Sequence, residues 1–99
     1  MSSHNWDVIG SFSDRALKRL YERGDRSGIR PDMLGKIERI LQRLDEITDP
    51  EQMNLPGYRL HGLSGDRKGF WSVTVNGNWR IVFRFGEGQP QDVELVDYH

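Results

Sequence analysis

The stretch that decides the fold covers residues 70–85 and reads FWSVTVNGNWRIVFRF. β-Branched and aromatic residues dominate both halves, and Asn76-Gly77-Asn78 separates them. Asn-Gly between two such runs is the strongest short-range signal for a β-hairpin. A two-residue loop made of Asn76 and Gly77 would place Arg80 opposite Val73 and Trp71 opposite Val82.

This register also predicts which side chains share a face of the sheet. The more apolar face collects four aromatic and aliphatic side chains: Phe70, Trp79, Ile81 and Phe83. We expect this face to bind the helices, so that Arg80 and Arg84 point away from them. A three-residue loop at 76–78 would instead reverse the facing of one strand.

Two helices are predicted before the hairpin. The first begins after the N-cap Ser13 and ends at Gly24, about ten residues later. The second begins at Pro31, which suits a first helical turn, and ends at Asp49, because a residue that precedes proline disfavours the helical conformation. Its apolar stripe recurs at helical spacing: Met33, Leu34, Ile37, Ile40, Leu41, Leu44 and Ile47.

Further strands are predicted around these elements. A weak first strand covers residues 6–12, a second covers 58–63 before the polar loop 64–69, and a last strand covers 93–99 after a turn at 86–90. The order β-α-α-β-β-β-β predicts an α+β fold. In this fold both N-terminal helices pack on one face of a mainly antiparallel sheet.

Composition limits the classes of protein that the chain can belong to. A length of 99 residues predicts a single domain, residues 1–99. The absence of cysteine excludes disulfides, thiolate metal sites and a cysteine nucleophile. His4, His61 and His99 lack the spacing of a metal site, and we expect no metal and no cofactor. Neither a signal peptide nor an apolar run of the roughly 18 residues that span a membrane is visible, so we expect a cytoplasmic protein with no membrane partner.

Positive charge is concentrated in the strand region, although the net charge of the whole chain is −1. Residues 52–86 hold one acidic residue, Asp66, and five basic ones: Arg59, Arg67, Lys68, Arg80 and Arg84. Residues 87–99 then contribute four negative charges. Such a basic stretch is typical either of an anion-binding face or of a solvated strand surface.

Groups suited to acid–base chemistry accompany these arginines. His61 precedes the polar loop, and Asp97-Tyr98-His99 closes the sequence. Each has an ordinary structural explanation alone. Together, two imidazoles, a carboxylate, a phenol and Arg80 suit proton transfer beside a phosphate group, because imidazole exchanges protons near neutral pH and arginine holds two phosphoryl oxygens.

Three segments resemble a known family: LPGYRLHGLSG at 55–65, GFWSVTVNGNWRI at 69–81 and VDYH at 96–99. They closely resemble the HigB family of toxins, within the RelE/ParE superfamily of type II toxin–antitoxin systems. Ile9-Gly10-Ser11-Phe12 and the helix pair also fit, so the resemblance covers nearly the whole chain. It implies a RelE-like fold and a ribosome-dependent endoribonuclease, an mRNA interferase that cuts mRNA in the ribosomal A site and stops translation.

The resemblance also implies partners and site residues. The partners are a helix-turn-helix antitoxin of the HigA type, the ribosome and A-site mRNA, with operator DNA bound only through the antitoxin. The family's active-site positions are matched by His61, Arg80, Asp97, Tyr98 and His99. The lysines that some superfamily members carry on the central strand are absent, and the predicted register puts Trp71, Val73 and Val75 there. The candidate RNA- or ribosome-binding residues are Arg59, Arg67, Lys68, Trp71 and Arg84.

The chemistry of such a ribonuclease needs no metal if the ribose 2′-oxygen is the nucleophile. We assign His99 as the general base, Arg80 as the cation that holds the phosphate and His61 as the general acid, although the two histidines can be exchanged. Asp97 would orient an imidazole, whereas Tyr98 would stack on a base or polarise the 2′-hydroxyl.

Two other functions fit the same scaffold. A ParE-like toxin would bind and poison DNA gyrase without cutting RNA, and the histidines and the Asp-Tyr pair count against it. A non-enzymatic module would only bind its partner and regulate an operon. Cleavage of mRNA on translating ribosomes separates the three functions.

Overall fold

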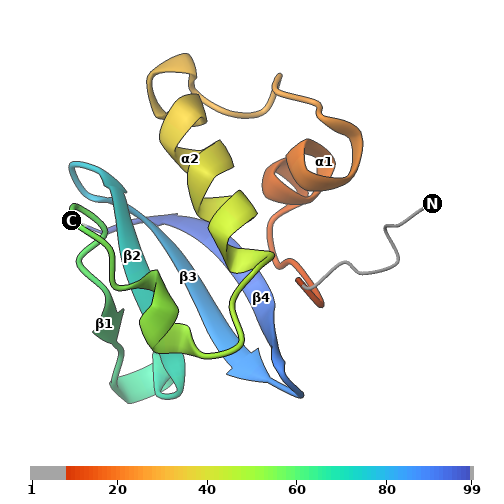
Figure 1. Cartoon of the computed structure of the whole chain (residues 1–99). Helices are drawn as coiled ribbons and strands as arrows, with labels where there is room; N and C mark the ends of the chain where they lie inside the picture. The colour runs from red at the N-terminus through yellow and green to blue at the C-terminus, as the bar shows by residue number, and fades with distance from the viewer. Residues whose placement is uncertain (1–8, 99) are drawn as a thin grey trace.

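The computed structural model describes residues 9–98, in which two helices precede a four-stranded sheet. The helices are α1 (Arg15–Arg23) and α2 (Pro31–Leu44), and the strands are β1 (His61–Gly62), β2 (Phe70–Asn76), β3 (Trp79–Gly86) and β4 (Gln89–Asp97). The strands pair antiparallel in the order β1-β2-β3-β4. Both helices lie on one side of the sheet (Figure 1), which confirms the predicted α+β fold.

The helix ends differ in part from the prediction. Asp14, not Ser13, caps α1, because its carboxylate accepts hydrogen bonds from the amides of Ala16 and Leu17. Gly24 ends α1 as predicted, in the left-handed conformation with φ 69°. The second helix starts at Pro31 as predicted but stops at Leu44.

Asp49 has a different role from the predicted helix end. Its carboxylate accepts a hydrogen bond from the amide of Glu51 and caps the 3₁₀ turn η2 (Pro50–Met53). Ile47 lies outside the helix yet is buried in the core, so the apolar stripe continues beyond the helical backbone. This continuation explains why periodicity alone overestimated the length of α2.

The core lies between the helices and one face of the sheet. Leu17 and Leu20 of α1 and Ile37 and Ile40 of α2 are buried there against residues of β2, β3 and β4. The strand residues of this cluster are Val73, Val75, Ile81, Phe83 and Val93. Each Å² of apolar surface that is buried contributes about 25 cal/mol to the free energy of unfolding. This cluster is therefore the main source of stability.

The predicted register of the hairpin is wrong by one residue. Val73 pairs with Ile81 and Trp71 pairs with Phe83, and the register shifts between Thr74 and Asn76. The turn residues are therefore 77–78 instead of 76–77. As a result, each side chain of β2 lies on the face of the sheet opposite to the predicted one. The correct register brings the apolar residues of both strands to the helices, and burial of these side chains favours it over the predicted one.

The outer strands also have other bounds than predicted. The strand expected at 58–63 is reduced to β1, and the last strand begins at Gln89 instead of Val93. Of the weak first strand at 6–12, residues 6–8 lie outside the described residues, and Phe12 makes an isolated parallel bridge to Val93. Arg80 and Arg84 lie on the sheet face away from the helices, as predicted.

Two glycines give a matched test of this backbone. Gly24→Ala places a Cβ at φ 69° and should lower the free energy of unfolding by about 1 kcal/mol. Gly35→Ala lies within α2 with open space around its Cβ, and it should raise the free energy of unfolding by roughly 0.5–1 kcal/mol. Urea titration of both variants measures the difference, and equal effects would contradict the left-handed cap.

Candidate functional site

The sheet face away from the helices holds the candidate site. Two rows of paired residues cross it: His61, Ser72, Val82 and Glu94 form one row, and Thr74, Arg80 and Val96 form the next. We call this surface the open face. Ser72 and Val82 are fully buried although neither helix lies over them, so side chains from elsewhere cover the middle of the open face.

Arg80 and Tyr98 meet on the open face, as the sequence predicts. The Arg80 guanidinium carbon lies 5.5 Å from the centre of the Tyr98 ring, a cation–π distance. The amide of Tyr98 donates a hydrogen bond of 2.8 Å to the carbonyl of Asn78, which holds the end of β4 beside the hairpin turn. Arg80 is thus half-buried and held in a defined place.

His61 shares the open face with Arg80 but does not touch it. His61 pairs with Ser72, and Arg80 pairs with Thr74 two residues further along β2. With strands about 4.8 Å apart and about 3.3 Å per residue, their Cα atoms are on the order of 12 Å apart. The imidazole is exposed and the guanidinium half-buried, and the paired residues Ser72 and Thr74 of β2 separate them on this face.

The segment that carries Arg59 and His61 is held by α2 and β2. Lys36 of α2 donates a hydrogen bond of 3.0 Å to the carbonyl of Gly57, and its ammonium lies 5.3 Å from the centre of the Tyr58 ring. The amide of Thr74 donates to the carbonyl of Tyr58 over 2.7 Å. Burial lowers the pKa of Lys36, and the nearby charge of Arg39 lowers it further.

Asp97 lies outside the row of paired residues that contains Arg80. Asp97 pairs with Trp79, whose side chain packs against the helix-side core. Neighbouring residues of a strand face opposite sides, so the position of Asp97 in β4 alternates with that of Val96, which pairs with Arg80. His99 lies outside the described residues.

Trp71, a predicted RNA- or ribosome-binding residue, lies on the helix side of the sheet instead of on the open face. It packs against the helix-side core, and a Cβ on Gly62 would lie 3.8 Å from its ring. With the correct register, Phe70, Ser72 and Thr74 occupy the open face of β2 in place of Trp71, Val73 and Val75. The same alternation in the sequence could have found Ser72 and Thr74, had the loop been placed one residue later.

Two of the predicted cationic residues are paired with acidic residues of β4. Arg67 approaches Glu94 to 3.4 Å, and Arg84 forms an ion pair with Asp92. Arg59 and Lys68 are exposed. The positive charges of residues 52–86 are thus partly neutralised in the folded protein, because β4 brings its carboxylates beside β3.

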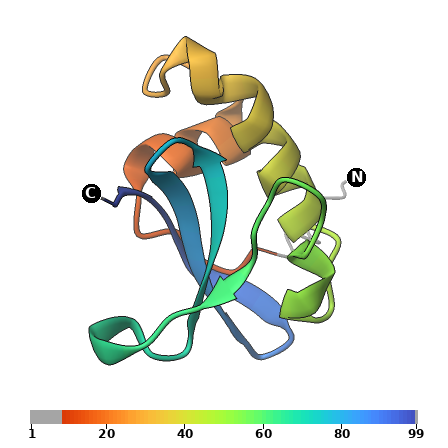
Figure 2. The ribbon, with the colours of Figure 1, turned by 90° about the vertical axis from the view of Figure 1, so that its left-hand side faces the viewer.

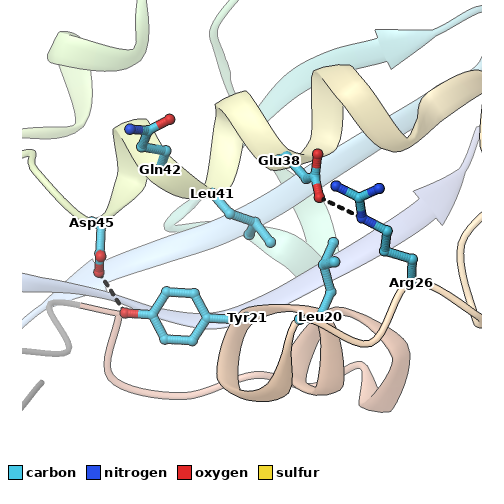
Figure 3. A pocket seen from close by; sticks show the side chains of 8 residues that line it. Leu20, Tyr21, Arg26, Glu38, Leu41, Gln42 and Asp45 are labelled. Carbon is cyan, nitrogen blue, oxygen red and sulfur yellow. Dashed lines mark hydrogen bonds and ion pairs between the residues drawn. The ribbon is translucent and has the colours of Figure 1, made fainter.

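A groove of about 380 Å³ lies on the opposite side of the molecule, between α1 and α2 (Figure 3). Leu20 and Leu41 line it, and two polar contacts border it: the Arg26–Glu38 ion pair at 3.2 Å and the hydrogen bond that Tyr21 donates to Asp45. These polar groups are paired with each other, so none of the four is left unpaired to react with a ligand in the groove.

Two features are absent from residues 9–98: a cluster of metal-ligating side chains and a membrane-spanning helix. No group of three or more histidine, aspartate and glutamate side chains that could hold a metal ion occurs in that part of the chain. Neither helix there has the length and hydropathy needed to cross a membrane.

The comparison with protein families decides the classification. Residues 10–99 match the family model of HigB-like toxins, described as the RelE-like toxin of the type II toxin–antitoxin system HigB. The chain belongs to the HigB-like toxin family. Membership confirms the resemblance seen in the sequence and makes an antitoxin the partner of this chain.

Individual relatives agree with this family. The chain is 41% identical over 92 residues to Endoribonuclease HigB of Proteus vulgaris, covering 93% of this chain and all of that protein. It is 34% identical over 82 residues to Toxin HigB-1 of Vibrio cholerae serotype O1, covering 78% of this chain and 83% of that protein.

Two solved structures share the fold of this HigB-like chain. YafQ from E. coli strain BL21(DE3) superposes with a TM-score of 0.61 at 15% identity, over 90% of each chain. A chain of the YoeB–YefM complex from Staphylococcus aureus gives 0.59 at 19% identity, over 92% of this chain and 94% of that one. These neighbours confirm the RelE-like architecture.

The tether of the His61 segment gives a testable prediction. Lys36→Met removes the hydrogen bond to Gly57 and should speed hydrogen exchange of the Thr74 amide by roughly tenfold, because a hydrogen bond from a charged donor is worth about 1.5 kcal/mol. Lys18→Met, at an exposed lysine of α1, should leave this exchange rate unchanged. Unchanged Thr74 protection in the Lys36 variant would contradict the tether.

Proposed function

We propose that this HigB-like toxin is an endoribonuclease that cleaves mRNA on the ribosome and thereby inhibits translation. The observation that carries the proposal is 41% identity over the full length of a relative named as an endoribonuclease. The open face adds physical support, because it presents an arginine held beside Tyr98 and an exposed histidine on the same side of the sheet.

Arg80 is proposed to hold the scissile phosphate. Its guanidinium has a planar set of donors suited to two phosphate oxygens, and Tyr98 limits its movement. The Tyr98 ring, which is 37% exposed, is also available to stack on a base or to polarise the 2′-hydroxyl. The two residues together would fix the phosphate and one neighbouring nucleoside.

The proposed reaction is an attack of the ribose 2′-oxygen on the adjacent phosphorus. A general base removes the 2′-hydroxyl proton, and a general acid protonates the departing 5′-oxygen. We propose His99 as the base and His61 as the acid, with the reverse assignment as the alternative, and Asp97 as the group that orients an imidazole. The products are a 2′,3′-cyclic phosphate and a 5′-hydroxyl, and the proposal includes no metal.

The remaining cations are proposed to bind the RNA or the ribosome. Arg59 and Lys68 are exposed and can do so directly. Arg67 and Arg84 must first exchange Glu94 and Asp92 for phosphate oxygens. Such exchange is inexpensive at partly exposed ion pairs, whose net contribution is about 0–1 kcal/mol.

The proposed partners follow from the same function. The antitoxin is proposed to be a helix-turn-helix protein of the HigA type, through which the complex contacts operator DNA. The ribosome and its A-site mRNA are the target, which places the activity in the cytoplasm.

The test is cleavage of mRNA on translating ribosomes, with chemical analysis of the cut ends. We expect a 5′-hydroxyl together with a cyclic phosphate or the 3′-phosphate formed when it opens. A 2′-O-methyl group at the scissile nucleotide should block cleavage, because it caps the nucleophile. Ends with a 5′-phosphate and a 3′-hydroxyl would overturn the mechanism, and growth arrest with intact mRNA and inhibited gyrase would favour a ParE-like toxin.

Arg80 gives a second prediction of this function. Arg80→Ala should lower the cleavage rate by about 10²-fold or more, since charge stabilisation at the phosphate is lost. Arg80→Lys should recover part of the rate, because lysine keeps the charge but lacks the planar set of donors. Arg39→Ala, at an exposed arginine of α2, is the matched control and should retain the parental rate. A fully active Arg80→Ala variant would remove Arg80 from the site.

The histidines give a third prediction. His61→Ala and His99→Ala should each lower the cleavage rate on ribosomes by about 10²–10⁴-fold, as expected for loss of a general acid or base. Binding of the antitoxin and the unfolding midpoint should stay near the parental values. An unaffected rate in either variant would withdraw the role of that histidine.

A further inference from the structure

Three buried polar atoms on the open face have no partner among the described residues. They are the Ser72 hydroxyl, the Thr74 hydroxyl and the Nε of Arg80. Thr74 pairs directly with Arg80 across β2 and β3, and Ser72 is two residues along β2 on the same face. We call these three groups the polar strip. Buried polar groups nearly always find a hydrogen-bond partner, so three neighbouring exceptions need an explanation.

The side chain of Arg67 crosses the open face next to the polar strip. Its guanidinium lies 5.6 Å from the centre of the Phe70 ring on β2 and 3.4 Å from the carboxylate of Glu94 on β4. It therefore spans β3 near Val82, which pairs with Glu94 on one side and with Ser72 on the other. Val82 and Ser72, which are completely buried on a face that no helix covers, lie in the paired row that ends at Glu94.

The ion pair that holds Arg67 in this place is open to exchange. The Arg67 and Glu94 side chains are 36% and 32% exposed, and their nearest nitrogen–oxygen distance is longer than that of a tight charge-assisted hydrogen bond. η3 (Gly65–Arg67), from which Arg67 extends, belongs to the loop that projects from the end of the sheet in Figure 2. An incoming polyanion can therefore compete with Glu94 for this guanidinium.

We propose that the polar strip is an additional binding site for phosphodiester oxygens of RNA, which the Arg67–Glu94 pair closes in the free protein. RNA opens the site when a phosphate takes Arg67 from Glu94. The hydroxyls of Ser72 and Thr74 and the Nε–H of Arg80 then donate hydrogen bonds to the backbone oxygens of the same strand. The inference rests on the proposed function in naming RNA as the ligand.

The chemistry of the three groups favours phosphate over other ligands. Arg80 Nε is a donor only, and the two hydroxyls can each donate one proton. Three neighbouring donors match an anionic oxygen acceptor. The neighbouring cations Arg67 and Arg80 supply the opposite charge that a phosphodiester needs.

The test uses the full chain without ribosomes and a single-stranded RNA that is 2′-O-methylated throughout. At low salt we expect a dissociation constant within about 10⁻⁶–10⁻⁴ M, and the Nε–H signal of Arg80 should shift in ¹⁵N-resolved NMR when the RNA binds. Absence of binding, or a bound state in which the Arg80 signal is unmoved, would overturn the proposal.

The hydroxyl variants separate a binding role from a structural one. Thr74→Val and Ser72→Ala should each weaken RNA binding by roughly tenfold, whereas Thr74→Ser should bind like the parent. The unfolding midpoints of Thr74→Val and Ser72→Ala should not fall, because the hydroxyls have no hydrogen-bond partner to lose among residues 9–98. Unchanged RNA binding would overturn the proposal, and so would a lowered midpoint together with weaker binding.

The Arg67–Glu94 ion pair, which we call the closing pair, has its own test. Glu94→Gln should tighten RNA binding several-fold in the parental chain, because it frees Arg67. In an Arg67→Met background the same substitution should tighten binding by less than about twofold, because there is no guanidinium to free. Glu87→Gln, an exposed carboxylate in the β3–β4 turn, is the matched control for the loss of one negative charge. An equal effect of Glu94→Gln with and without Arg67 would show that no closing pair exists.

These outcomes are distinct from those of the proposed function. Failure to cut mRNA on ribosomes would overturn the ribonuclease function and leave the binding results standing. Absence of RNA binding without ribosomes, together with normal cleavage on ribosomes, would overturn the binding role of the polar strip. It would leave the proposed cleavage by Arg80 and the histidines standing.

Discussion

The antiparallel pairing of Val73 with Ile81 and of Trp71 with Phe83 decides which side chains of the hairpin meet the helices. It joins two apolar rows into one surface, and α1 and α2 bury that surface. Because side chains alternate along a strand, the same pairing leaves Ser72, Thr74 and Arg80 on the other face. The helix-side core and the proposed binding face thus lie on opposite sides of the sheet because of one register, and a slip of one residue would disturb both.

The open face contributes less to the free energy of unfolding than an apolar core of the same size would. A buried polar group without a partner costs about 1–3 kcal/mol, and the partly exposed ion pairs nearby contribute little in return. Binding sites commonly keep such unsatisfied groups, because a ligand that completes their hydrogen bonds gains what the free protein lacks. The large helix-side core, from Leu17 to Val93, makes this cost tolerable.

The sequence predicted the elements of the fold well and their exact ends less well. Periodicity located both helices and the hairpin, since these signals depend on neighbours along the chain. The register was missed because the Asn-Gly signal favoured a turn at 76–77, whereas burial of Val73 and Val75 favours the shift at Val75. Arg80 and Tyr98 were placed together correctly. The pairing of Arg67 with Glu94 was not foreseen, because the two residues are 27 positions apart and meet only through the sheet.

The most direct measurement is a structure of the toxin on a ribosome whose mRNA carries a 2′-O-methyl group at the scissile nucleotide. We predict that the scissile phosphate lies on the open face between His61 and Arg80, with a neighbouring phosphate at Ser72 and Thr74 and with Arg67 detached from Glu94. An mRNA strand seated elsewhere, for example at the groove between α1 and α2, with the Arg67–Glu94 pair intact, would contradict this assignment of the open face.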